Sequence, residues 1–193
     1  MSVKGSHTTA TYVEWDIMLE IIRDLEKQDN YRDALLIGIG IYTGLRIGDI
    51  LRLRWEHVLD LQELVRIEHK TKKRRVIPIN DNLHDLILRA YPKLNPWNDH
   101  YFIFHRLRNF KKTIPLISVN RYIKEACLAH GVEGNISSHT LRKTFGRKIW
   151  ENNGKSAEAL VMLSEIFNHQ DLSVTRRYLG IRQAELGSLY LNL

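Results

Sequence analysis

The sequence predicts a mainly helical α+β domain with a small antiparallel sheet inserted after the third helix. Apolar residues recur at steps of three and four over most of the chain, as in amphipathic helices. β-branched residues, in contrast, cluster between residues 65 and 79. The 193 residues, 44% of them hydrophobic, suffice for one compact domain. We expect residues 1–10 to be a disordered segment and residues 11–193 to form that domain.

Two amphipathic helices are expected at the start of the domain. The first spans residues 11–27, where Thr11 and Glu14 form a capping-box sequence ahead of a regular apolar stripe. The second spans residues 31–42 and is more continuously apolar, so it should be buried. Gly44 follows it and is a suitable stop, because glycine readily adopts the left-handed conformation that ends helices.

A short third helix is expected over residues 47–54, followed by a β-hairpin. The hairpin's two strands are indicated by β-branched residues on either side of a polar, basic segment: Val65, Ile67, Val76, Ile77 and Ile79. Residues 69–73 then lie at or near its tip. Pro78 suits an edge strand, because proline cannot donate a backbone hydrogen bond.

The helical period returns at residue 81 and is expected to give way to a loop marked by Pro92 and Pro96. Residues 101–104 suggest a short extended piece, and residues 106–116 carry no clear pattern. Further helices are expected from capping residues, and the helix that follows Asp171 carries Tyr178. They start at Ser118, at Ser137 or Ser138, at Ser156, at Asp171 and near Glu185.

The charge indicates the kind of partner that the protein binds, and the cysteine content indicates the cellular compartment. The net charge is +7, and its basic residues fall in separate blocks that are able to converge on one face, as in polyanion-binding proteins. A solvated basic surface without a partner would have the same composition. A single cysteine, Cys127, forms no internal disulfide, and the longest uncharged stretch is too short to span a bilayer. We therefore expect a cytoplasmic protein without membrane association.

Four motifs together supply the groups that a phosphodiester-cleaving tyrosine needs. Arg46 ends the run Thr-Gly-Leu-Arg, and Arg142 ends a Ser-His-Thr-Leu-Arg run that also contains His139. His169 and Tyr178 lie nine positions apart near the C-terminal end. Two guanidiniums can clamp a phosphate, because each pairs with it bidentately and stays charged. A phenol can attack it.

These motifs resemble, in order and spacing, those of the tyrosine recombinases (phage integrase family). The fourth is a basic segment in which Lys70 precedes Pro78 by eight residues, as in that family's β-hairpin lysine motif. The resemblance implies the catalytic domain of such an enzyme over residues 11–193, without the N-terminal core-binding domain that members usually carry. The implied activity is site-specific DNA strand cleavage and rejoining through a 3′-phosphotyrosine, in integration, excision or inversion.

The resemblance also implies a role for each matching residue. Tyr178 is the nucleophile, Arg46 and Arg142 hold the scissile phosphate, and His169 donates to it. His139 is the candidate base and Lys70 the candidate general acid, although Lys72 or Lys73 are near enough to exchange roles with it. Asp49 is expected to orient its neighbours. Contacts to DNA are expected from a basic set: Lys72, Lys73, Arg74 and Lys143.

The partners implied are double-stranded DNA and further copies of the chain, assembled as a tetramer on DNA, in a bacterial or phage-like setting near the nucleoid. No metal or other cofactor is expected, since the covalent link conserves the bond energy. Four positions depart from the family pattern: Gly48-Asp49 replaces Ser-Glu, Lys143 replaces a common histidine, and Asn168 replaces a common glycine. Two alternatives remain: a DNA-binding module without catalysis, and nicking and resealing in the manner of a type IB topoisomerase.

Overall fold

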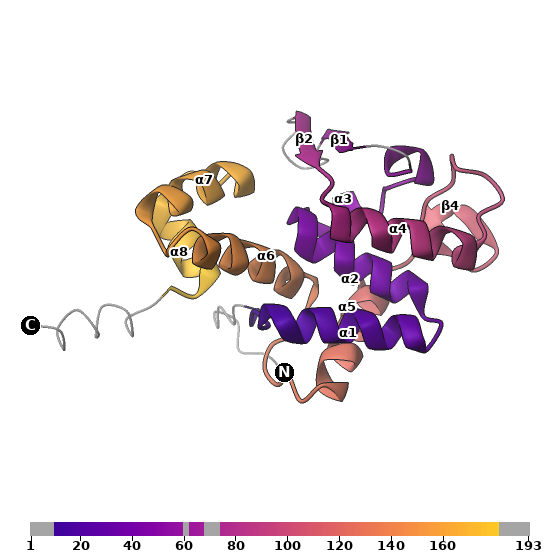
Figure 1. Cartoon of the computed structure of the whole chain (residues 1–193), viewed down its shortest axis with the longest axis horizontal. Coiled ribbons are helices and arrows are strands. Elements are labelled where there is room, and N and C mark those ends of the chain that lie inside the picture. Colours follow the sequence, from indigo (N-terminus) through magenta and orange to yellow (C-terminus); the bar gives the residue numbers. More distant parts are fainter. Residues whose placement is uncertain (1–9, 60–61, 68–73, 182–193) are drawn as a thin grey trace, which may run out of the picture.

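A computed structural model describes residues 10–59, 62–67 and 74–181. These residues form a mainly helical fold with two small antiparallel hairpins, and the predicted fold class is confirmed (Figure 1). The elements in chain order are α1 (Trp15–Lys27), α2 (Tyr31–Thr43), α3 (Ile47–Ile50), a 3₁₀ turn (Trp55–His57), β1 (Glu63–Ile67), β2 (Arg74–Pro78), α4 (Asp81–Leu94), β3 (His105–Arg106), β4 (Asn109–Thr113), α5 (Leu116–Ala129), α6 (Ser138–Asn152), α7 (Ala157–Phe167) and α8 (Leu172–Leu179).

Helix α2 is the centre of the larger apolar core. It contacts α1, α4, α5 and α6, and its residues 34–41 are all buried. Two glycines let neighbouring helices approach: a Cβ at Gly38 would lie 2.3 Å from Leu86 Cδ2 of α4, and one at Gly40 would lie 2.6 Å from Leu141 Cδ1 of α6. The even burial of α2, predicted from its continuous apolar run, therefore follows from its having neighbours on every side.

A second, smaller apolar cluster joins the end of α6 to α7 and α8. It consists of Trp150, Ala159, Leu160, Leu163, Phe167 and Leu179. Figure 1 shows α7 and α8 at one end of the long axis, connected to the rest of the fold through α6. The C-terminal third of the described chain thus has a core of its own.

The N-terminal end of α1 differs from the prediction. The helix begins at Trp15, not at Thr11, and Glu14 is its N-cap without a side-chain hydrogen bond, so the predicted capping box is wrong. The Thr11 N–H donates instead to the Asn135 carbonyl (2.9 Å). Val13 exchanges two hydrogen bonds with the buried Thr144 hydroxyl, at 3.0 and 3.1 Å. Tertiary partners satisfy this backbone in an extended form.

The centre of the chain also departs from the prediction. Helix α3 ends at Ile50 instead of Arg54, because Leu53 and Arg54 pair with the segment at residues 102–103; the Ile103 N–H donates to Leu53 O at 2.9 Å. Residues 106–116 carried no clear pattern, and most of them belong to the β3–β4 hairpin, which spans residues 105–113.

Two helix boundaries were also predicted wrongly. Pro92 lies inside the last turn of α4, and the helix continues to Leu94 before Asn95 ends it in the left-handed conformation (φ 42°). Helix α5 begins at Leu116, after an N-cap at Pro115, and not at Ser118. The Ser118 N–H donates to the Pro115 carbonyl (3.0 Å), so this residue already lies in the first turn.

Several local predictions are confirmed. Val65 pairs with Val76 in the first hairpin, and Gly44 ends α2 with a φ of 59°. The Ser156 hydroxyl accepts from the Ala159 N–H (3.2 Å), and the Asp171 carboxylate accepts from the Ser173 N–H (2.6 Å). The expected hairpin tip at residues 69–73 and the expected helix at residues 185–193 lie outside the described residues.

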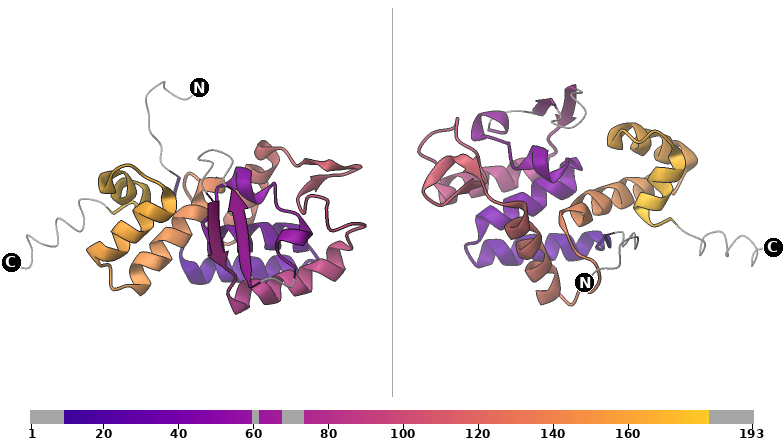
Figure 2. Two further views of the ribbon diagram at one scale, coloured as in Figure 1. Left: turned by 90° about the horizontal axis from the view of Figure 1, so that it is seen from above. Right: turned by 180° about the vertical axis from the view of Figure 1, so that it is seen from behind.

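Within the described ranges, no helix has both the length and the apolar character needed to cross a membrane. The two hairpins are separate in the fold: β1–β2 stands above α3, and β3–β4 projects at the end of the molecule opposite α7 and α8 (Figures 1 and 2). The turn before α3, the start of α6 and the α7–α8 junction, which carry the sequence motifs, meet between these ends.

Candidate active site

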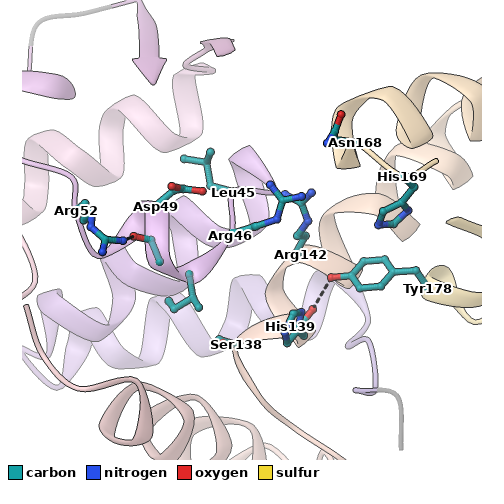
Figure 3. A pocket seen from close by; sticks show the side chains of 12 residues that line it. Leu45, Arg46, Asp49, Arg52, Ser138, His139, Arg142, Asn168, His169 and Tyr178 are labelled. Atoms are coloured by element: carbon teal, nitrogen blue, oxygen red, sulfur yellow. Dashed lines mark hydrogen bonds between the residues drawn. The ribbon is translucent and has the colours of Figure 1, made fainter. Parts of the chain in front are cut away.

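Three distant segments line one pocket of about 520 Å³ between the two apolar clusters. They are the α2–α3 turn with α3, the first turns of α6, and the α7–α8 junction with α8 (Figure 3). The lining residues are Leu45, Arg46, Ile47, Gly48, Asp49, Arg52, Ser138, His139, Arg142, Asn168, His169 and Tyr178. Six of the predicted site residues are thereby brought together: Arg46, Asp49, His139, Arg142, His169 and Tyr178.

The remaining predicted residues have other positions. Lys70, Lys72 and Lys73 lie outside the described residues, so their roles stay predictions. Arg74 is exposed at the start of β2. Lys143 was expected to contact DNA, but its side chain is only 4% exposed, and its ammonium lies 5.4 Å from the centre of the Tyr178 ring. That position suits support of the tyrosine better than contact with a duplex.

The two arginines converge on one main-chain oxygen. The Phe167 carbonyl accepts from Arg46 Nη2 at 3.0 Å and from Arg142 Nη2 at 3.2 Å. Arg142 Nη1 also donates to the Gly44 carbonyl, and the guanidinium lies 4.4 Å from the centre of the Phe167 ring. Arg142 is 5% exposed, so it is a buried cation with a fixed orientation. Figure 3 shows the two guanidiniums side by side.

The position of Phe167 explains why two cations can be held this close. It is the last residue of α7, where the helix dipole places partial negative charge on unpaired carbonyls. Asn168 follows in the left-handed conformation (φ 52°, ψ 51°) and ends the helix there. Two adjacent guanidiniums repel each other, and a dianionic or monoanionic oxygen group placed between them would relieve that repulsion.

His169 is fixed by a neighbour that the sequence analysis missed. Its Nδ1 lies 2.9 Å from the Thr175 hydroxyl, and Thr175 is completely buried in α8. When the hydroxyl donates to Nδ1, the ring carries its proton on Nε2, which is then a donor for a ligand. Burial lowers the pKa of His169, and the positive charges of Arg142 and Arg46 lower it further. The lowered pKa favours the neutral ring, which in this tautomer donates through Nε2.

Tyr178 faces the arginines from α8 (Figure 3). Its hydroxyl donates to the main-chain carbonyl of His139 at 3.5 Å, and its ring packs edge-on against His169 with centres 5.5 Å apart. Burial raises the pKa of Tyr178 to about 12, against the opposing effect of Arg142 and Arg46. The phenol is thus protonated in the free protein, and a base must take its proton if it is to attack.

His139 and Asp49 lie at opposite sides of this arrangement. The His139 side chain is exposed at the first turn of α6, where it lines the pocket beside the Tyr178 hydroxyl. Asp49 is 2% exposed and lines the pocket from α3.

The sequence signal for Thr175 was available only in part: it precedes Tyr178 by three residues, which places both on one face of a helix.

A model of the phage integrase family matches residues 12–185, nearly the whole described chain. The chain belongs to the phage integrase family. Its predicted membership and its predicted class, that of site-specific DNA recombinases, are confirmed at this level. The matched range includes every segment that lines the pocket.

Among relatives of this phage integrase family protein, the probable integrase/recombinase YoeC of Bacillus subtilis (strain 168) is 35% identical over 182 residues, covering 90% of this chain and 96% of that protein. The tyrosine recombinase XerD of Staphylococcus epidermidis is 26% identical over 171 residues, covering 86% of this chain and 56% of XerD. The chain therefore spans nearly the full length of YoeC and just over half of XerD.

Solved structures confirm the fold. The crystal structure of XerA recombinase matches with a TM-score of 0.72 and 20% identity, covering 99% of this chain and 66% of that chain. A post-cleavage complex of XerH site-specific recombinase with a palindromic difH substrate matches with a TM-score of 0.69 and 18% identity, covering 98% of this chain and 55% of that chain. A lambda integrase tetramer bound to a Holliday junction matches with a TM-score of 0.62 and 18% identity, covering 93% of this chain and 52% of that chain.

Proposed function

We propose that this family member cleaves and rejoins DNA at a specific site, with Tyr178 as the nucleophile. The observation that carries the proposal is the convergence of Arg46, Arg142, His169 and Tyr178 on one pocket from segments far apart in the sequence. A protein that only bound DNA would need cations, but it would not need a phenol held beside two of them. The residue roles below belong to this proposal.

The first step is an in-line attack of Tyr178 Oη on a DNA phosphorus. An O–P bond to the tyrosine forms as the P–O5′ bond breaks, which leaves a 3′-phosphotyrosine and a free 5′-hydroxyl. In the second step the 5′-hydroxyl of a partner strand attacks the same phosphorus and displaces the tyrosine. One phosphodiester is exchanged for another, so no energy source is consumed. Two such rounds would recombine two sites.

The arginines provide the charge stabilisation that this step requires. Negative charge builds on the non-bridging oxygens in the pentavalent transition state, and Arg46 and Arg142 are already oriented by the Phe167 carbonyl before DNA arrives. His169 adds a neutral donor held by Thr175. Because these donors are preorganised, little reorganisation is needed at the moment of reaction.

Two proton transfers complete the chemistry. The Tyr178 proton has to leave because burial keeps the phenol protonated up to a pKa of about 12, and His139 beside it is the proposed acceptor. Lys70 is the proposed donor to the departing 5′-oxygen, a role that typically contributes about 10²- to 10⁴-fold. Asp49, buried under the pocket, is proposed to orient its neighbours.

The proposed partners are double-stranded DNA and three further copies of the chain. DNA is supported by the paired guanidiniums and by the net charge of +7. The tetramer is supported by fold similarity to lambda integrase, whose structure is a tetramer on a Holliday junction. Each tetramer would hold four copies of the pocket, one for each strand to be exchanged.

The test uses a pool of nicked, partly randomised duplexes, from which cleavage releases a short fragment and so traps the covalent complex. Wild type and Tyr178→Phe are compared on a denaturing gel. We expect an adduct with wild type alone, and sequencing of the trapped DNA then gives the target site. The variant should retain its DNA affinity, because only one hydroxyl is removed.

Three outcomes would contradict the proposal in different ways. Salt-sensitive binding without an adduct would indicate a DNA-binding module. An adduct that forms and reseals but never exchanges strands would indicate topoisomerase-like nicking. Loss of DNA binding in Tyr178→Phe would show that the residue has a structural role instead of a chemical one.

A further inference from the structure

The β3–β4 hairpin carries a concentration of positive charge that the pocket does not use. Four basic side chains on it are exposed: Arg106, Arg108, Lys111 and Lys112. Residues 95–113 contain a single acid, Asp99, and its carboxylate accepts a hydrogen bond from the Tyr91 hydroxyl at 3.0 Å. The hairpin therefore presents a local excess of cations, at the end of the molecule opposite α7 and α8 (Figure 2).

The tip of this hairpin is held in one conformation. Arg106 Nε donates to the Thr113 carbonyl at 3.1 Å, and the Asn109 side chain accepts from the Lys111 N–H at 3.2 Å. Arg108 adopts a φ of 69°, which closes the turn between the strands. Leu107, next to it, is 89% exposed. An apolar side chain flanked by two arginines is thus presented to solvent.

Phe110, next to the tip on β4, anchors the hairpin in an aromatic stack. Phe110 lies between Trp97 and Tyr101, with ring centres 6.3 and 5.3 Å away and ring planes tilted by 25° and 21°. His105 adds an edge contact at 4.6 Å. A hairpin anchored in this way loses little backbone conformational entropy when a ligand binds to it, so less of the binding free energy is offset by ordering the hairpin.

We propose that the β3–β4 hairpin is a second DNA-contacting element, which grips backbone phosphates of the duplex away from the phosphate that is cleaved. The inference rests on the proposed function, which brings a duplex to the pocket. A cationic tip with an apolar side chain between arginines matches the chemistry of elements that contact DNA grooves and their phosphates. These contacts would position the duplex without taking part in bond breaking.

The test measures how DNA affinity depends on salt. Tyr178→Phe serves as the parent, so that no covalent complex forms, and the probe is a fluorescent mixed-sequence duplex of about three helical turns. The hairpin variant neutralises three exposed residues: Arg108→Gln, Lys111→Gln and Lys112→Gln. Lys111 and Lys112 follow each other on β4, where successive side chains tend to alternate between faces, so we expect two of the three charges to reach phosphates.

Each phosphate contact contributes about 0.9 to the slope of log affinity against log salt, so the hairpin variant should show a slope shallower by about 1.8. The control variant changes the net charge equally at α1 and α4: Arg23→Gln, Lys27→Gln and Lys93→Gln. Its slope should equal that of the parent. With Tyr178 restored, the hairpin variant should still form the adduct once enzyme saturates the DNA.

Results that overturn the inference are separable from failure of the proposed function. A parent-like slope in the hairpin variant overturns the inference and leaves the proposed function intact. The inference is also overturned if the hairpin variant keeps the parent's slope of log DNA affinity against log salt but loses binding to poly-glutamate. That result would assign the hairpin to an acidic protein partner. A parent that shows no salt-dependent duplex binding at all overturns both.

Discussion

Thr175 lies one helical turn before Tyr178 and contacts Nδ1 of His169 at 2.9 Å, so one short helix carries both the proposed nucleophile and the group that orients a proposed donor. Arg46 and Arg142 are oriented in a comparable way by main-chain carbonyls. The reacting groups thus depend on partners that themselves touch no substrate. Changes at those partners should affect the rate of cleavage more than the affinity for DNA.

Thr175→Val keeps the side-chain shape and removes the hydroxyl. Loss of one hydrogen bond worth about 0.5–1.5 kcal/mol should slow adduct formation by about 2- to 12-fold at saturating enzyme, with DNA affinity unchanged. Thr175→Ser should restore the rate, because it restores the hydroxyl. Equal rates for the Val and Ser variants would contradict the orienting role and leave only a packing effect.

Arg142→Ala should lower the rate of adduct formation by at least about 10²- to 10³-fold, since it removes a preorganised donor from the developing charge. It also leaves the Gly44 and Phe167 carbonyls without this donor, so the free energy of unfolding should fall by about 1–3 kcal/mol. Arg142→Lys keeps the charge without the planar guanidinium, so its rate of adduct formation should lie between those of wild type and Arg142→Ala. Near-normal cleavage by the alanine variant would exclude the phosphate-clamp role.

The lowered pKa of His169 has a consequence for stability. The unfolded chain binds the imidazole proton near its ordinary pKa of about 6.5, whereas the folded protein binds it only at lower pH. Stability from this site is therefore complete above that pH and lost as the pH falls through it toward the folded pKa. In urea unfolding at a series of pH values, the free energy of unfolding of His169→Gln should depend less on pH in this window than that of wild type.

At the scale of elements, α8 is placed by its contact with α6 and α7. A Cβ at Gly146 of α6 would lie 2.6 Å from Leu179 Cδ2 and 2.7 Å from Phe167 Cζ. The absence of a side chain at this one position lets α8 approach closely enough for the Tyr178 hydroxyl to reach the start of α6. The position of Tyr178, the proposed nucleophile, therefore depends on a residue that is not part of the pocket.

Gly146→Ala should displace α8 and slow adduct formation, while overpacking lowers the free energy of unfolding by about 1–3 kcal/mol. Gly38→Ala is the matched control: its Cβ would meet Leu86 Cδ2 at 2.3 Å, but in the larger core, away from Tyr178. We expect the control to lose stability and to keep the cleavage rate at saturating enzyme. If both variants cleave at the wild-type rate at a temperature where they are folded, α6–α8 packing does not set the position of the nucleophile.

The elements also show what the sequence alone can predict. Caps at Ser156 and Asp171 and the stop at Gly44 were predictable because the signals are local to the backbone that they satisfy. The start of α1 was not, because the partner of the Thr11 N–H is Asn135, far along the chain. The β3–β4 hairpin was missed because its strands carry polar and basic side chains and pair through backbone atoms, which leaves no period to detect.

Over the whole molecule, the candidate site lies on the boundary between two apolar clusters of unequal size. Arg46 belongs to the side built around α2, whereas His169 and Tyr178 belong to the side built from α7 and α8. The six predicted residues that line the pocket could be selected because their motifs resemble, in order and spacing, those of the tyrosine recombinases. Their position at this boundary was not, since it depends on how the clusters pack.

Amide hydrogen exchange should reveal this division. The smaller cluster buries less apolar surface, so amides of α7 and α8 should exchange faster than those of α2. A duplex bound by groups from both sides should slow exchange in α7 and α8 most of all, because it links them to the larger part. Uniform protection with and without DNA would show that the described residues open as one cooperative unit.

The shared acceptor of the two arginines is a main-chain oxygen, and this has an implication for divergence. No side chain supplies it, so substitution at position 167 cannot delete it as long as α7 ends where it does. Selection would then act on the point of helix termination, at Asn168, and leave wide freedom in residue identity around it. Such an atom leaves no trace in a sequence comparison, and distant relatives can keep it after nearly every neighbouring residue has changed.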